Sequence, residues 1–141
     1  MTKTIPLQPH FKGTIIINMK IVQIGPYPPP SGGIASHVAR LHSVLTKLRY
    51  DSTVVDVFNR SGSEDEKKAN IQAIRYEGPT PTRLIKTVGT IWRLKPDIIH
   101  LHLASMRNFR WIGPLLLAIL PRSIQLITLH GGNFVNSHRR L

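Results

Sequence analysis

Short apolar runs alternate along the chain with segments whose apolar residues recur every three or four positions. A short apolar run bounded by turn residues is typical of a buried strand, and the wider spacing is typical of a helix with one buried face. The sequence therefore predicts strands at 20–25, 53–58, 97–102 and 123–129, with a weaker candidate at 71–76. Helices are predicted at 34–48, 82–94 and 109–120.

The apolar positions of the first two predicted helices define the faces that should pack on a sheet. In the first helix these positions are Ile34, Val38, Leu41, Leu45 and Leu48. In the second helix they are Leu84, Ile85, Val88, Ile91 and Trp92. Ser31 lies just before the first helix, where serine is a preferred residue, so we expect it in the N-cap region.

The order of these elements predicts the fold class. Strands separated by helices need crossover connections, so we expect an α/β fold: a Rossmann-like, mainly parallel sheet with helices on both faces. Ligands of such sheets bind beyond the carboxyl ends of the strands. The residues that follow Gly25, His102 and Leu129 should therefore line a binding site.

The chain is predicted to form a single domain over residues 19–141. Residues 1–18 have little pattern and lack the apolar core of a signal peptide, so we expect them to be an N-terminal extension outside this domain. No stretch reaches the roughly 20 consecutive apolar residues of a membrane span. The chain has no cysteine, which excludes disulfides and zinc–thiolate sites and fits a cytoplasmic protein.

The net charge of the chain is its most unusual property and bears on the kind of partner that it binds. The chain has 19 Lys and Arg against 7 Asp and Glu, a formal net charge of +12, so a polyanionic partner is expected: nucleic acid, an anionic membrane surface or a phosphorylated substrate. The alternative is that a further part of the protein supplies compensating acid. Aromatic residues make up only 6% of the chain, which argues against recognition of RNA bases by stacking.

The first candidate site is the turn between the first strand and the first helix, which is rich in proline and ends in Ser31, Gly32 and Gly33. Two glycines at a helix start let a ligand approach the backbone closely, and the free N–H groups there favour phosphate. The segment matches neither the dinucleotide-binding fingerprint nor the P-loop. The alternative is a plain strand-to-helix turn that binds nothing.

Histidines form the second candidate site. His100 and His102 share one face of a strand, and His130 follows the last strand, where it could contact a substrate hydroxyl or stabilise developing charge. The alternative is that these side chains only pack. A three-histidine metal site is not favoured, because no carboxylate beyond Asp97 is at hand to orient the imidazoles.

Taken together, these features resemble the N-terminal, acceptor-side domain of retaining GT-B glycosyltransferases of the family 4 type. The segments that carry the resemblance are MKIVQIGPYPPPSGGIASHVARL at 19–41, KPDIIHLH at 95–102 and ITLHGG at 127–132. The first segment is quite specific, and the other two match in order and spacing. The match extends over roughly residues 19–136.

The resemblance implies a function in sugar transfer from a nucleotide-sugar donor to a sugar or lipid-linked acceptor, with no other cofactor and no metal. It implies that Ser31, Gly32 and Gly33 lie near the donor phosphates and that His130 contacts the donor sugar. His100, His102, Gly131 and Gly132 are expected to line the cleft. A C-terminal donor-binding domain is missing from the 141 residues, so we expect a domain that is truncated at its C-terminal end and inactive alone.

Two other functions remain open from the sequence: a non-catalytic basic module that binds membrane or nucleic acid, and a metal hydrolase that uses His100, His102 and His130. Membrane docking at the inner face has a local motif as well. Residues 79–96 contain no acid, and the segment carries four cations beside an apolar stripe: Arg83, Lys86, Arg93 and Lys95. Because a sheet should cover that stripe, we expect only the cations and the helix end near Trp92 to touch lipid.

Overall fold

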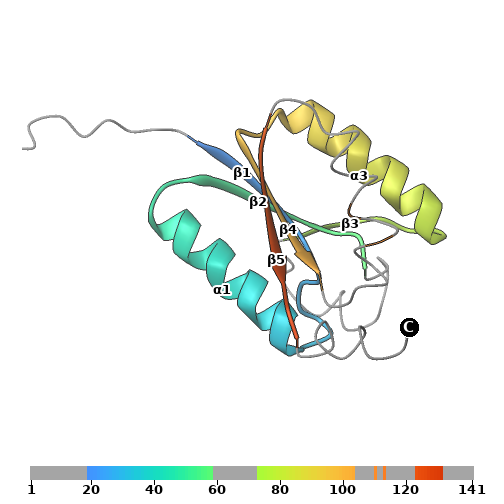
Figure 1. Cartoon of the computed structure of the whole chain (residues 1–141), viewed down its shortest axis with the longest axis horizontal. Coiled ribbons are helices and arrows are strands. Elements are labelled where there is room, and N and C mark those ends of the chain that lie inside the picture. The colour runs from blue at the N-terminus through green and yellow to red at the C-terminus, as the bar shows by residue number, and fades with distance from the viewer. Residues whose placement is uncertain (1–18, 59–72, 104–109, 111–112, 114–122, 132–141) are drawn as a thin grey trace, which may run out of the picture.

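The computed structural model describes residues 19–58, 73–103, 110, 113 and 123–131. This part of the chain forms one sheet flanked by two long helices (Figure 1). The elements are β1 (Lys20–Ile24), α1 (Gly33–Lys47), β2 (Asp51–Asp56), β3 (Ala73–Arg75), α3 (Thr80–Leu94), β4 (Ile98–Leu103) and β5 (Ile124–Leu129).

The sheet has the strand order β3-β2-β1-β4-β5, and every neighbouring pair is parallel. In the centre of the sheet, Gln23 is level with Val54 on one side and with His100 on the other. Since all strands run the same way, their carboxyl ends meet at one edge. The predicted α/β, Rossmann-like class is confirmed.

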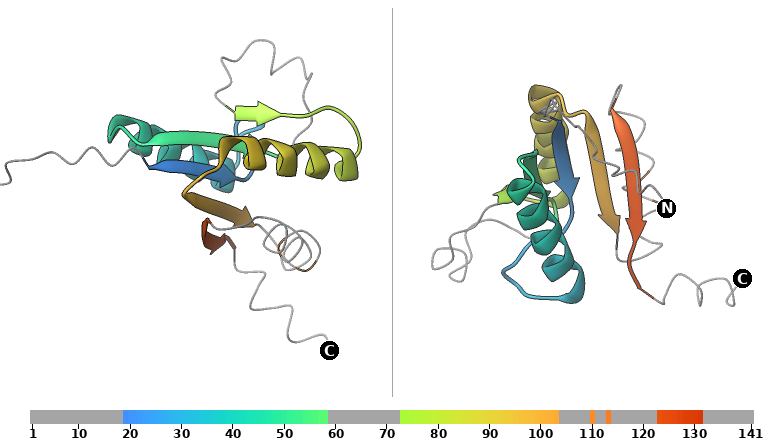
Figure 2. Two further views of the ribbon diagram at one scale, coloured as in Figure 1. Left: turned by 90° about the horizontal axis from the view of Figure 1, so that it is seen from above. Right: turned by 90° about the vertical axis from the view of Figure 1, so that its left-hand side faces the viewer.

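The two helices pack on opposite faces of the sheet, because successive side chains of a strand point to opposite sides. Val55 and Leu101 belong to the larger apolar core, which also contains Ile91 of α3. Val54, the neighbour of Val55, packs instead with Val38 of α1. Figure 2 shows the two helices in two further views of the layers.

The face toward α1 is the more polar one. Gln23 is fully buried there and donates a hydrogen bond from its side-chain amide to Oγ of Ser52 over 3.2 Å. The same hydroxyl lies 3.0 Å from Nδ1 of the buried His42 on α1. A buried polar group is costly unless it is hydrogen-bonded, so these contacts offset the cost of placing polar residues between helix and sheet.

The predicted strands are present, with ends that differ by at most two residues. Helix α3 begins at Thr80, two residues earlier than predicted, because Pro81 fits the first turn of a helix. Among the described residues, no helix is long and apolar enough to cross a membrane. The predicted helix at 109–120 and the predicted extension at 1–18 lie outside the described residues, apart from Arg110 and Gly113.

Three sequence predictions about the helices hold only in part. The N-cap of α1 is Gly32, the residue after Ser31, and no side chain caps the helix. Of the predicted α1 face, Val38 is buried and Ile34 packs against the core, whereas Leu48 is 63% exposed. Of the predicted α3 face, three residues pack in or against the core and two, Ile85 and Trp92, are exposed; the three are Leu84, Val88 and Ile91.

The reason for the error in α3 is that polar residues occupy its inner face. The buried residues of this helix are Arg83, Thr87, Thr90 and Ile91. A helical wheel places Ile85 and Trp92 about two turns apart on one side, away from that set. When threonines occupy part of the buried face of a helix, hydrophobicity alone does not reveal which of its apolar residues face the core.

Gly25, just after β1, lies in a tight space between β4 and α1. A methyl group added at this position would lie 3.0 Å from Cβ of His102 and 3.3 Å from Cγ2 of Val38. We expect Gly25→Ala to lower the free energy of unfolding by about 1–3 kcal/mol through overpacking, measured by urea denaturation.

Gly33→Ala is the matched control for that variant. An added methyl at Gly33 meets no atom within 4 Å, and the residue begins a helix. We expect Gly33→Ala to be neutral or to stabilise the domain by up to about 1 kcal/mol. Equal losses in the two variants would contradict the close approach at Gly25.

Candidate functional site

The candidate site lies at the carboxyl edge of the sheet, where the ends of β1, β4 and β5 meet the first turns of α1. Alternation along β4 sends Leu101 and Leu103 into the larger core, and His100 and His102 to the α1 side. Residue 130 follows β5 directly, and its backbone N–H donates to the carbonyl of Leu103 over 2.8 Å. This hydrogen bond holds the chain after β5 beside the end of β4.

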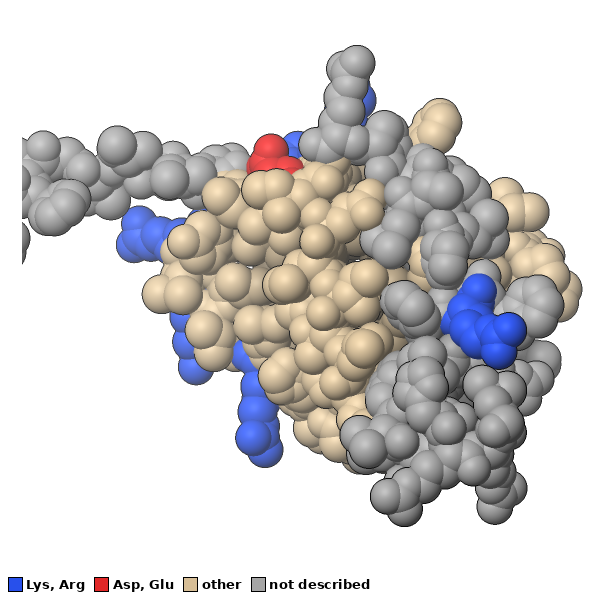
Figure 3. Space-filling view, viewed as in Figure 1, with Lys and Arg blue, Asp and Glu red and all other residues tan. Residues whose placement is uncertain are grey.

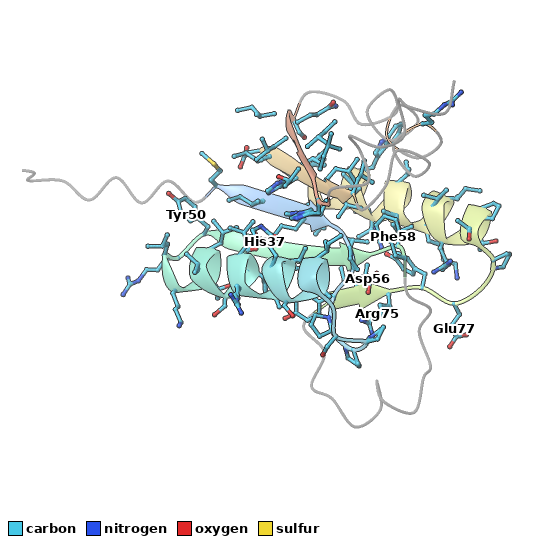
Figure 4. The ribbon with its side chains drawn as sticks, turned by 60° about the horizontal axis from the view of Figure 1, so that its bottom comes forward. His37, Tyr50, Asp56, Phe58, Arg75 and Glu77 are labelled. Atoms are coloured by element: carbon cyan, nitrogen blue, oxygen red, sulfur yellow. The ribbon has the colours of Figure 1, made fainter. Side chains whose placement is uncertain are left out.

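Three histidines from three different elements meet at this edge: His37 of α1, His102 of β4 and His130 after β5. Nδ1 of His102 lies 3.1 Å from Nε2 of His130, so one ring donates a hydrogen bond to the other. The ring centroid of His37 is 5.0 Å from that of His130 and 5.7 Å from that of His102. His37 is labelled on α1 in Figure 4.

The three rings differ in exposure. His102 is fully buried, His130 is half-buried and His37 is exposed. Nε2 of His102 is a buried atom with no hydrogen-bond partner. The site is therefore a small imidazole cluster in which the ring of His102 is buried and the ring of His37, on α1, is exposed to solvent.

His100 shares its face of β4 with His102 but makes a different contact. Its Nε2 lies 2.7 Å from Oγ1 of Thr128 on β5, and its ring centroid is 3.9 Å from that of His102. His100 thus packs beneath the cluster and is held by β5. The predicted grouping of His100 with His102 is confirmed as a shared face, but the third histidine whose ring nitrogen lies within 4.8 Å of those of His102 and His130 is His37.

Burial lowers the pKa of the histidines at this edge. The pKa of His102 is about 3, first because of desolvation and then because of the neighbouring imidazoles. The pKa values of His100 and His130 are also lowered, again chiefly by desolvation. These three rings are neutral at pH 7, so each has one N–H donor and one acceptor nitrogen.

The glycine turn lies at the start of α1. Ser31, Gly32 and Gly33 are all exposed, and side chains added to either glycine would meet no atom within 4 Å. The N-cap Gly32 has an extended backbone that any residue adopts, so the fold does not require glycine there. The first turn of α1 has no acidic residue and no side-chain cap, which leaves its N–H groups to an anion.

The proline-rich loop before these glycines is held from below by a buried ion pair. Nε of Arg75 lies 3.0 Å from Oδ2 of Asp56, and both side chains are buried. Asp56 also accepts a hydrogen bond from the backbone N–H of Tyr27 over 3.1 Å. Arg75 donates to the backbone carbonyls of Tyr27 and Pro29. Figure 4 shows Asp56 and Arg75 together at the ends of β2 and β3.

Sequence reasoning missed three residues of this edge: His37, Asp56 and Arg75. His37 lies one helical turn after Gly33, so the helical period alone would have placed it near the glycines. Asp56 ends a β-branched strand, where a lone buried acid is a usable signal. No sequence signal marked Arg75 as its partner.

Two of the other predicted site residues follow β5. Gly131 has a positive φ of 112°, a conformation that favours glycine, and it is exposed. Gly132 lies outside the described residues. The structure thus brings Gly32, Gly33, His102, His130 and Gly131 to one edge of the sheet.

Comparisons with protein-family models, curated proteins and solved structures find no match for this chain.

The buried imidazole of His102 makes the domain less stable in acid. Its pKa falls from 6.5 to about 3 on folding, so the unfolded chain takes up the proton first as the pH drops. Stability from the neutral ring is complete above about pH 6.5 and is lost as the pH falls toward 3, by up to about 1.4 kcal/mol per pH unit.

We therefore expect the free energy of unfolding, measured in urea with a chelator present, to fall more steeply from pH 7 to pH 5 in the parent chain than in His102→Asn. The slopes are compared rather than the absolute stabilities, because the replacement also changes packing. Above pH 7 the two slopes should agree, which serves as an internal control. Equal slopes below pH 6.5 would contradict the burial of His102.

Proposed function

We propose that this chain is the acceptor-side domain of a retaining GT-B glycosyltransferase. The observation that carries the proposal is the pair of exposed glycines at the start of α1. Their added side chains would meet open space and their backbones do not require glycine, so packing gives no reason for them. A ligand that approaches the backbone closely gives such a reason.

The position of the glycines supports a phosphate as that ligand. They begin a helix whose first turn carries no acid and no capping side chain, and free N–H groups at a helix start favour negative charge. They lie at the carboxyl edge of a parallel sheet, which is where ligands of this fold class bind. The basic balance of the chain adds to the attraction for a phosphorylated ligand.

His130 is proposed to contact the donor sugar. Its Nε2 is engaged with Nδ1 of His102, so its Nδ1 is the nitrogen available to a ligand. In the proposed reaction the bond from C1 of the sugar to the diphosphate oxygen breaks and a bond from C1 to the acceptor oxygen forms. The acceptor proton is released, and the nucleoside diphosphate is the leaving group. The donor's nucleotide is assigned to a second domain, as the resemblance implies.

The test is a chimera that joins this chain to the donor-binding domain of a retaining GT-B enzyme. Transfer by the chimera should depend on the glycine turn: Gly33→Val places a branched side chain where the phosphate approaches, and we expect kcat to fall by at least about 100-fold. His130→Ala should lower kcat as well, with the circular dichroism spectrum unchanged. Initial rates with a labelled nucleotide sugar give both numbers.

Gly89→Val is the matched control, because Gly89 also lies exposed in a helix and an added side chain there meets no atom within 4 Å. It should retain the parent rate within a factor of a few. A Gly33→Val chimera as active as the Gly89→Val chimera would mean that the turn binds no phosphate. Residues 1–141 alone should show no transfer.

We further propose that the outer face of α3 contacts an anionic membrane. Ile85 is 72% exposed and Trp92 is 57% exposed, on one side of the helix. The exposed cations Lys86 and Arg93 lie on the same helix, Lys95 is its C-cap, and no acid occurs in the helix. Arg83, which was also expected to touch lipid, is buried and takes no part in this surface. Apolar and aromatic side chains beside cations are typical of a helix that lies at a lipid headgroup boundary.

The end of α1 carries a similar arrangement, because Val44 is 50% exposed and Leu48 is 63% exposed there, beside the exposed cations Lys47 and Arg49. In Figure 3 the described part of the visible face is largely neutral, with most of the Lys and Arg side chains at its left and upper edges. Leu48 is the C-cap of α1, which packs on the opposite face of the sheet from α3. Leu48→Ser therefore separates a membrane contact through α3 from one through the end of α1.

Co-sedimentation with vesicles tests the membrane contact. We expect binding to vesicles that contain anionic lipid and little binding to neutral vesicles, with loss of binding at high salt. Ile85→Ser and Trp92→Ser should each weaken it, because each removes apolar surface that would enter the headgroup region, whereas Leu48→Ser should not. Equal, negligible binding to both kinds of vesicle would overturn the proposal, as would an equal effect of Leu48→Ser.

A further inference from the structure

The imidazole cluster at the carboxyl edge exceeds what the proposed sugar contact requires. That contact uses one ring, His130, whereas three histidines from α1, β4 and β5 converge. One ring nitrogen from each of His37, His102 and His130 lies within 4.8 Å of the other two. Three separate elements supply these rings, so their meeting is a property of the fold and not of one local stretch of sequence.

The spacing of these nitrogens is close to that of ligands around one metal ion. Zinc–nitrogen bonds of about 2.0–2.1 Å in a tetrahedral site put neighbouring nitrogens roughly 3.3 Å apart. Nδ1 of His102 and Nε2 of His130 are already 3.1 Å apart. His37 is the exposed member, so its side chain can turn inward by the small distance that remains.

The rest of the site restrains the two inner ligands. His102 is fully buried, and its Cβ lies 3.0 Å from where a Gly25 side chain would begin, so its ring is closely packed. Residue 130 is fixed by its backbone hydrogen bond to Leu103. A site with two restrained ligands and one mobile ligand loses less conformational freedom on binding than three exposed histidines would.

We propose that His37, His102 and His130 bind one zinc ion, with the fourth position left to water. Three imidazoles suit zinc and its first-row neighbours, whereas magnesium, calcium and manganese prefer carboxylate oxygens, which this cluster lacks. No carboxylate partner of the rings is present among the described residues, and such partners normally strengthen binding. The site should therefore bind zinc more weakly than carboxylate-supported sites do.

This inference goes beyond sugar transfer. An ion held by Nε2 of His130 ties α1 to β4 and β5 and leaves Nδ1 of that ring to the sugar contact. Zinc should also stabilise the domain, because a ligand that binds only the folded chain raises its stability.

The experiment uses residues 1–141 freed of metal with a chelator. Isothermal titration with zinc and visible absorption with cobalt as a spectroscopic probe should both show one ion per chain. Tetrahedral cobalt absorbs far more strongly than octahedral cobalt, so the spectrum reports the coordination geometry, and the histidine variants identify the ligands. His37→Ala, His102→Asn and His130→Ala should each weaken binding by at least about tenfold, the effect that even the loss of a partner of a ligand has.

His37→Ala is the decisive variant, because an exposed side chain can be removed without opening the core. His42→Gln is the control: this ring is on the same helix but pairs with Ser52 instead. The melting temperature should rise with zinc in the parent chain and in the control, and much less in His37→Ala. The proposal fails if zinc binds His37→Ala as tightly as the parent, if the cobalt spectrum is that of an octahedral ion, or if no binding occurs.

Discussion

The buried ion pair between Asp56 and Arg75 is the constraint on which the geometry of the site depends. It joins the ends of β2 and β3, and through Tyr27 and Pro29 it fixes the proline-rich loop that leads to the glycines of α1. Removing one partner of such a pair leaves an uncompensated buried charge, which typically costs about 3–5 kcal/mol. Rigid prolines alone would set the shape of the loop but not its position over the sheet.

The two faces of the sheet differ in polarity and in what they contribute to the domain. The face toward α3 is apolar and continuous, with Val55, Leu101 and Ile91 in one core, and supplies the hydrophobic burial. The face toward α1 holds Gln23 and the histidines of β4 between helix and sheet. Buried polar residues are tolerated there because neighbours such as Ser52 and Thr128 form hydrogen bonds with them. The chemistry of the domain is thus confined to one side of the same strands.

The sequence was sufficient for the architecture, and for the edge of the sheet at which the candidate residues gather. Apolar runs of strand length and the alternation of strands with helices determine a parallel sheet, and the carboxyl ends of its strands then coincide. Which histidine completes the cluster could not be derived in this way. That depends on how α1 is rotated about its axis, and a buried His42 and an exposed Leu48 show that hydrophobicity did not fix the rotation.

The inner face of α3 illustrates the same limit. Arg83, Thr87 and Thr90 are buried where a pattern of apolar residues would place Ile85 and Trp92. The hydroxyl of Thr90 meets that of Tyr76, so a polar contact with the segment after β3 helps to set the rotation of this helix. Such contacts depend on residues far apart in the chain, and a local period carries no information about them.

The absent side chain of Gly25 constrains the later history of this position. An added Cβ at 25 would lie 3.0 Å from Cβ of His102 and 3.3 Å from Cγ2 of Val38. Every residue except glycine has a Cβ, so replacing His102 would not relieve the first of these contacts. Descendants of this sequence could therefore lose the imidazole cluster and still keep glycine at 25.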